Sequence, residues 1–116
     1  MISQFPFSFA MTALQSGVNP LTNWQNDQPG FPCKMTILVR ATNVNVRMTA
    51  YAGNALLTER TPVQTGGTAG QTPAALTTTP FEFDVGAGEK IKLSFDEVAS
   101  TTPTVDGLII LEPYYA

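Results

Sequence analysis

The segments Phe81-Glu82-Phe83-Asp84-Val85 and Ile91-Lys92-Leu93-Ser94-Phe95 decide the fold that we expect for this chain. In both runs an apolar residue alternates with a polar or charged one, which is the period-two pattern of a half-buried β-strand. The residues between them, Gly86-Ala87-Gly88-Glu89, are typical of a tight turn. We therefore predict a β-hairpin whose apolar side chains face each other at the centre of the core.

The same alternation recurs in the preceding part of the chain. Residues 34–41 and 43–51 place apolar side chains at every second position, apart from Leu38, which interrupts the first run. Thr42-Asn43 between them predicts either a turn or a bulge within one long strand. Gly53-Asn54 predicts a tighter turn that returns the chain as the second strand of a β-hairpin.

The end of the chain completes an all-β pattern. Residues 107–111 are apolar throughout, which predicts a strand in the middle of a sheet, and Pro113 ends it because proline has no N–H to donate. Short strands separated by frequent turn signals predict an antiparallel two-sheet sandwich, or jelly roll, of about seven to eight strands. A closed barrel is the alternative. A chain of 116 residues fits one domain, residues 1–116.

The N-terminal residues 1–10 are predicted to form an extended apolar arm. Phe5, Phe7 and Phe9 stand at alternate positions, as in an edge strand. An apolar edge of this kind promotes aggregation when it is left bare. The arm is therefore a candidate contact with a partner protein.

Two connections lie outside the regular pattern. Residues 16–32 are rich in Asn, Gln and Pro and contain Trp24, the only tryptophan; we expect them to lie over the sandwich. Residues 61–73 are rich in Gly and Thr and are expected to form a long flexible loop, because small polar side chains bury too little area to offset ordering. Loops of this length in compact domains are usually functional.

Composition argues against several classes of partner. Only 13% of the residues are charged, the net charge is −3, and the six Lys and Arg residues are scattered. A nucleic-acid surface needs a basic stripe, and an electrostatic membrane anchor needs a basic cluster, so we expect neither partner. The N-terminus lacks the pattern of a signal peptide. Cys33 is the only cysteine, so no internal disulfide can form, which fits a reducing compartment and synthesis in the cytoplasm.

The residues for catalysis are scarce. The chain has no histidine, which excludes a Ser-His-Asp triad and a histidine zinc site. Glu82 with Asp84, or Asp96 with Glu97, are the candidate carboxylate pairs for glycosidase chemistry, and Asp96, Glu97 and Asp106 are candidate calcium ligands. Solvated surface carboxylates are the better interpretation of all five. We therefore expect no catalytic residue, no metal and no cofactor.

The aromatic residues leave two possibilities open. Trp24, Tyr51, Tyr114 and Tyr115 are the types that stack on sugar rings in carbohydrate-binding modules, and they are also common anchors of protein interfaces. An equally strong expectation is that Trp24 caps the core beneath its own long connection.

The overall layout resembles the small head decoration, or cement, proteins of tailed bacteriophages. The resemblance lies in the apolar arm, the Gly- and Thr-rich loop, the segment Gly86-Ala87-Gly88-Glu89-Lys90-Ile91-Lys92-Leu93, and the closing strand before Glu112-Pro113. It implies a virion protein that binds the outside of an icosahedral head as a dimer or trimer. There it staples neighbouring major capsid protein subunits and acts on no small-molecule substrate.

A structural virion protein is therefore the leading hypothesis. The candidate interface residues are Phe5, Phe7, Phe9, Trp24, Gly66, Gly67, Gly70, Tyr114 and Tyr115. The alternative is a carbohydrate- or receptor-binding module, such as a fibre or spike domain, whose glycan affinity would be lost on Trp24→Ala. An enzyme that works through carboxylates alone is a distant third.

Overall fold

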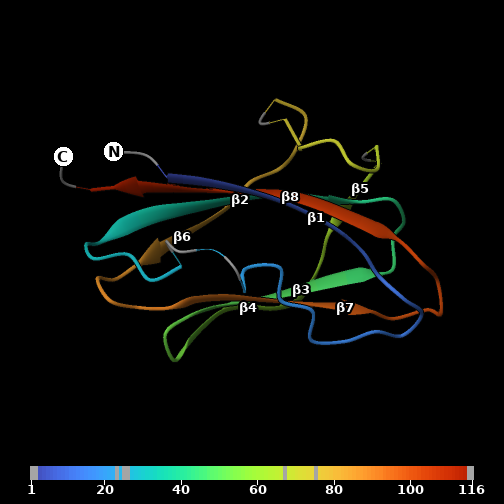
Figure 1. Ribbon diagram of the computed structural model, residues 1–116, viewed down its shortest axis with the longest axis horizontal. Helices are drawn as coiled ribbons and strands as arrows, with labels where there is room; N and C mark the ends of the chain where they lie inside the picture. The colour runs from blue at the N-terminus through green and yellow to red at the C-terminus, as the bar shows by residue number, and fades with distance from the viewer. Residues whose placement is uncertain (1–2, 23, 25–26, 67, 75, 115–116) are drawn as a thin grey trace.

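The computed structural model describes residues 3–22, 24, 27–66, 68–74 and 76–114, which fold into two packed β-sheets without a helix (Figure 1). The strands are β1 (Ser3–Ala10), β2 (Cys33–Ala41), β3 (Val46–Ala52), β4 (Ala55–Pro62), β5 (Gln64–Thr65), β6 (Phe81–Val85), β7 (Ile91–Glu97) and β8 (Thr104–Pro113). The larger sheet has the order β1-β8-β2-β5, with β6 also paired to β2, and the smaller sheet has the order β4-β3-β7. The predicted all-β sandwich is confirmed.

The core lies between the two sheets and is built from the alternate positions predicted by the sequence. In β2 the side chains of Met35, Ile37 and Val39 are almost fully buried against the other sheet. Leu38 points to the opposite, outward face of the larger sheet and is only 2% exposed. The predicted central strand is also confirmed, since β8 lies between β1 and β2.

The predicted hairpin between residues 81–85 and 91–95 is wrong. Both segments are strands, but β6 pairs with β2 in the larger sheet and β7 pairs with β3 in the smaller one. Residues 86–90 therefore cross from one sheet to the other. The apolar sides of both strands do face the core, but they approach it from opposite sheets, because period-two alternation specifies the buried face and not the neighbouring strand.

The connection after β2 also crosses between sheets. Residues 42–45 lead from the larger to the smaller sheet, so they form neither a hairpin turn nor a bulge in one strand. Val44, predicted to face the core, lies before β3 and is 67% exposed. The predicted hairpin around Gly53-Asn54 is confirmed: Ala52 pairs with Ala55, and Gly53 has the positive φ of 60° that such a turn favours.

The N-terminal arm is an integral strand of the larger sheet. β1 pairs along its whole length with β8 and turns its three phenylalanines towards the core. The ring of Phe7 lies against Gly107 of β8, and a Cβ atom at Gly107 would overlap that ring. A glycine is therefore required at this position by the aromatic residue opposite it.

The described residues of the segment 16–32 lie over the sandwich, as predicted. Leu21 and Trp24 are buried, and the Trp24 ring stacks on Phe5 with 5.2 Å between ring centroids. Val18 exchanges two backbone hydrogen bonds with Phe95 of β7. This connection therefore occupies the outer edge of the smaller sheet as well as covering the core.

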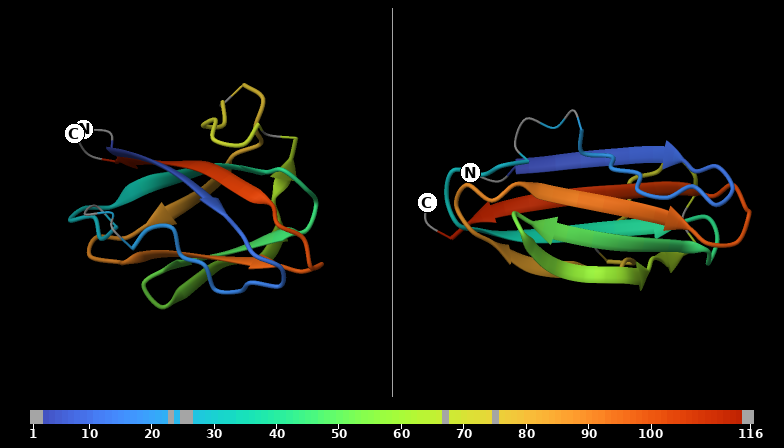
Figure 2. Two further views of the ribbon diagram at one scale, coloured as in Figure 1. Left: turned by 45° about the vertical axis from the view of Figure 1, so that its right-hand side comes forward. Right: turned by 90° about the horizontal axis from the view of Figure 1, so that it is seen from below.

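The predicted flexible loop at residues 61–73 begins later in the chain than expected. Thr61 and Pro62 end β4, Val63 is buried, and Gln64–Thr65 form β5, which runs parallel to the end of β2. The described residues of the segment 66–79 then project from the outward face of the larger sheet before the chain enters β6 (Figures 1 and 2). We call residues 66–79 the strap.

Candidate interaction surfaces

The aromatic residues predicted as a contact surface are largely used inside the domain. Phe7 and Trp24 are 8% and 7% exposed, and Phe5 and Phe9 are half-buried against the core. The ring of Phe9 also meets Phe95 of the other sheet edge-on, with 5.3 Å between centroids. Their rings therefore pack within the folded chain, with Trp24 over the core, and their role as interface residues stays a prediction.

The edge of β1 remains a candidate surface even though its aromatic side chains are buried. The backbone N–H of Met11 donates a hydrogen bond of 2.8 Å to the carbonyl of Pro103. Pro103 is the residue opposite Met11 when the β1–β8 register is extended by one pair. Because hydrogen-bonded pairs alternate along an antiparallel ladder, the phenylalanine positions bond to β8. The backbone groups of Gln4, Pro6, Ser8 and Ala10 therefore point to the free edge. Pro6 offers only its carbonyl there, because proline has no N–H.

Among the edges that the described residues form, β1 is the least protected. The edge of β7 is covered by Gln15, Val18 and Asp27, which all accept backbone N–H groups from β7. β4 has register shifts and carries two charged residues, while β6 is short and also carries two. Charges, irregular pairing and shortness are the usual protections against strand addition. β1 has eight residues and no charged side chain.

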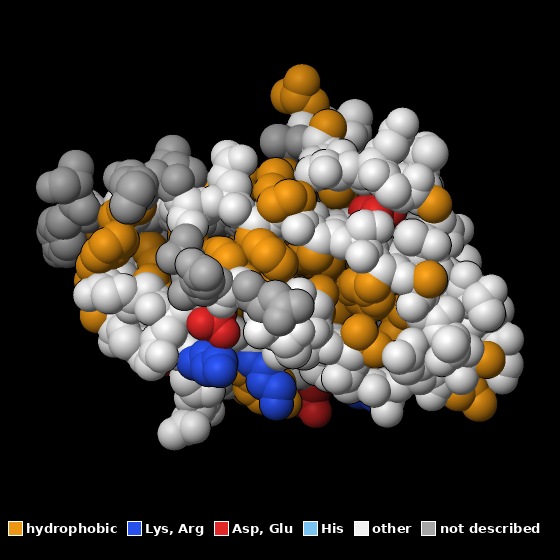
Figure 3. All heavy atoms as spheres, viewed as in Figure 1, with side chains coloured by type: hydrophobic (Ala, Val, Ile, Leu, Met, Phe, Trp, Pro, Cys, Tyr) orange, Lys and Arg blue, Asp and Glu red, His pale blue; other side chains and the backbone are white. Residues whose placement is uncertain are grey.

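The face that includes β1 is also poor in charge. Figure 3 shows hydrophobic side chains spread along this face, with few Lys, Arg, Asp or Glu side chains among them. On the outward side of the larger sheet, Pro6, Leu108 and Leu38 form one cross-strand row that ends at the free edge. A partner strand that binds here desolvates little charge.

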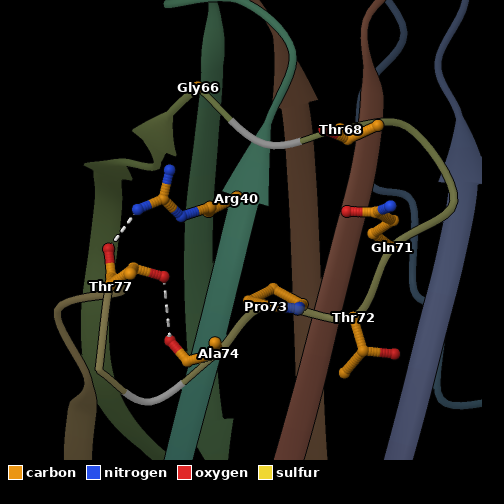
Figure 4. Close-up of a pocket in the computed structure, with 8 residues that line it drawn as sticks. All are labelled: Arg40, Gly66, Thr68, Gln71, Thr72, Pro73, Ala74 and Thr77. Carbon is orange, nitrogen blue, oxygen red and sulfur yellow. Dashed lines mark hydrogen bonds between the residues drawn. The ribbon is translucent and has the colours of Figure 1, made fainter.

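Arg40 of β2 connects both ends of the strap to the sandwich. Its guanidinium donates hydrogen bonds to the Thr65 carbonyl at 3.1 Å, to the Thr78 hydroxyl at 3.1 Å, and to the Thr77 carbonyl. Figure 4 shows the guanidinium between the two ends of the strap. A hollow of about 190 Å³ lies beside it. A planar group with several donors is suited to joining two chain segments in this way.

A buried carboxylate holds the middle of the strap. Asp106 of β8 is paired in register with Arg40 and is only 3% exposed. Both of its carboxylate oxygens accept the backbone N–H of Gly70 at 3.2 Å. Three glycines of this segment were predicted as interface residues. Gly70 is anchored to the sheet, and Gly66 lines the hollow next to Arg40. Gly67 lies outside the described residues.

No protein-family model, curated protein or solved structure matches this chain.

Close to the base of the strap lies an apolar groove. It has a volume of about 470 Å³. Its walls are formed by Val44, Pro62, Val63, Gln64, Thr65, Thr79 and Phe81. No charged residue is among them. Beyond the groove the strap presents Leu76, whose side chain is 100% exposed. Sequence reasoning missed both Leu76 and Arg40. The one available signal was for Leu76, which is a large apolar residue among small and polar ones.

Tyr114 lies at the opposite end of the larger sheet and is 51% exposed. Its hydroxyl donates a hydrogen bond to Asp84, and this bond raises the pKa of the phenol above its usual range. Lys34 and Glu82 form an ion pair of 3.6 Å beside it, and both side chains are well exposed. Tyr115, the other predicted tyrosine, lies outside the described residues.

The candidate catalytic carboxylates make structural contacts. Asp96 pairs with Arg60 at 3.1 Å, and Glu97 is 3% exposed. Burial acts to raise the pKa of Glu97, but hydrogen bonds from Thr101, Leu14 and Ala99 outweigh it and lower that pKa to about 2. Glu97 thus ties together the loops at one end of the sandwich. Within the described part of the chain, no three His, Cys, Asp or Glu side chains are grouped to hold a metal ion.

Cys33 is fully buried at the start of β2, and burial raises the pKa of its thiol. The thiolate is the reactive form of cysteine, so this side chain is a poor nucleophile at neutral pH. The described residues contain no helix that is both long and apolar enough to cross a bilayer.

Proposed function

We propose that this chain is a non-enzymatic structural virion protein that binds the outside of a phage capsid. In this role it stabilises contacts between major capsid protein subunits, as the resemblance to head decoration proteins implies. The observation that carries the proposal is the outer edge of β1, which is long and uncharged and whose residues Gln4, Pro6, Ser8 and Ala10 are exposed.

Strand addition is the mode of binding that this edge supports. An extended segment of a capsid subunit pairs with the outward backbone groups of Gln4, Ser8 and Ala10, and with the carbonyl of Pro6. Main-chain hydrogen bonds then supply affinity, while side chains on alternate positions supply selectivity. Pro6, which is exposed, and the half-buried Leu108 beside it give the added strand an apolar surface to pack on. Repetition of this contact around a symmetric shell multiplies a weak individual affinity.

The test uses the purified chain and phage heads that lack it, sedimented together. Ser8→Pro removes one outward N–H without removing a β1–β8 hydrogen bond. Ser8→Ala is the matched control, because it also removes the hydroxyl but keeps that N–H. We expect the wild-type chain and Ser8→Ala to sediment with the heads and Ser8→Pro to bind at least about tenfold more weakly. Equal binding of the two variants refutes the β1 edge as the contact.

Circular dichroism and thermal unfolding check that both variants fold. If the wild-type chain fails to bind heads at all, the capsid role itself is refuted. In that case a glycan-binding measurement tests the alternative of a receptor-binding module.

A further inference from the structure

The groove and the tip of the strap together form a surface that is complementary to itself. The groove is lined by the apolar side chains of Val44, Val63 and Phe81, and Leu76 is the one fully exposed large hydrophobic residue among those described. An exposed leucine on an anchored segment costs little ordering entropy when it is buried by a partner. The chain thus carries both an apolar projection and an apolar recess.

Leu76 and the groove are connected through residues 77–79 of the strap. Gln64, which lines the groove, donates from its side-chain amide to the Thr77 carbonyl at 3.1 Å. The Gln64 carbonyl oxygen accepts the backbone N–H of Thr79 at 2.7 Å. Leu76 is adjacent to Thr77 in the chain, so the projection stands next to the groove without filling it. A two-fold interface requires this arrangement, because the same patch must offer both complementary parts.

We infer that two copies of this chain associate about a two-fold axis, with Leu76 of each copy inserted into the groove of the other. The inference deepens the proposed function by naming the self-association contact, and it rests on that function for its biological role. Neither the strap, residues 66–79, nor the lining of the groove contains a charged residue. Association therefore buries no charged residue of the strap or of the groove lining, and the neighbouring Arg40 keeps its hydrogen bonds to Thr65, Thr77 and Thr78.

Arg40 gives the interface its rigidity. Its hydrogen bonds to Thr65 and Thr77 connect β5, beside the groove, to the strap beside Leu76. The projection and the recess are therefore held at one relative position before association. Pre-organisation of this kind reduces the cost of binding.

The test measures the solution mass of the purified full-length chain by light scattering over a range of concentrations. We expect a dimer of twice the 12.4 kDa chain mass. Leu76→Asp places a charge in the groove and is expected to weaken dimerisation about a hundredfold or more. The matched control is Leu56→Asp on β4, because Leu56 is also an exposed leucine, at 50%, but belongs to the other sheet.

A cross-linking experiment tests the contact directly. With Leu76→Cys and Val44→Cys in one chain, oxidation is expected to give a covalent dimer on a denaturing gel, since Val44 lines the groove. The native Cys33 is buried and does not compete. The control pair, Leu76→Cys with Leu56→Cys, is expected to stay monomeric.

Two results overturn the inference. One is a monomer at all concentrations, and the other is a dimer unaffected by Leu76→Asp. Neither depends on capsid binding: a monomer that still sediments with heads refutes only this inference. A Leu76-dependent dimer that does not bind heads refutes only the proposed function.

Discussion

Replacing Arg40 with methionine tests whether one side chain holds the strap to the sandwich. Methionine keeps the unbranched apolar stem but removes the guanidinium and its three hydrogen bonds. The bonds to Thr65 and Thr78 are partly buried and contribute about 1–1.5 kcal/mol each. The bond to Thr77 is exposed, so water replaces it at little cost. We therefore expect opening of the strap to become easier by about 2–3 kcal/mol.

Hydrogen exchange at the Gly70 amide measures this opening, because that N–H is held by the buried carboxylate of Asp106. A change of about 2–3 kcal/mol corresponds to exchange that is about 30–140 times faster. The amide of Ile109 in β8 serves as an internal control for global unfolding and is expected to change much less. An unchanged rate at Gly70 refutes the reasoning. Equal acceleration at Gly70 and Ile109 also refutes it, because Arg40 would then support the whole domain.

Further predictions concern the core and two of the buried titratable groups. Gly107→Ala is expected to lower stability by about 1–3 kcal/mol through overlap with Phe7, and Phe7→Leu in the same chain is expected to recover part of the loss in urea unfolding. Phe7→Ala alone should cost about 3–5 kcal/mol in the same assay. The pKa of Glu97 in the folded chain, about 2, lies below its usual value of 4.5. The ionised carboxylate therefore stabilises the fold fully above pH 4.5, and this stabilisation disappears as the pH falls through 2. In Glu97→Gln, the midpoint of thermal unfolding should depend less on pH between these two values. Because burial raises the pKa of the Cys33 thiol, iodoacetamide at neutral pH is expected to label it only in denaturant, and rapid labelling of the folded chain would contradict its burial.

Local alternation was a reliable guide to which segments are strands and which side chains are buried. Met35, Ile37 and Val39 face the core as predicted, and so do Leu93 and Phe95. These assignments succeed because the direction of a side chain in a strand depends only on its position in the pleat. The phenylalanines of β1 follow the same rule, and their alternation predicted a strand correctly although its partner is the chain's own β8.

The candidate surfaces were less predictable for a related reason. Arg40 occupies an ordinary polar position in the sequence, and its role arises only because Thr65, Thr77 and Thr78 fold back around it. The groove is similarly assembled from residues on both sides of the strap and from Val44. Only the long, small-residue composition of the loop pointed towards a functional segment.

The sequence by itself determined an all-β domain, the positions of most strands and the face that each one buries, because these follow from neighbouring residues. The tertiary structure alone decided that β6 and β7 belong to different sheets, that β2 and β6 pair, and that β1 is left as a free edge. Such pairings depend on hydrogen bonds and packing between segments that are distant in the chain, such as residues 33–37 with 81–85. The local pattern of apolar residues does not specify which distant segment a strand pairs with.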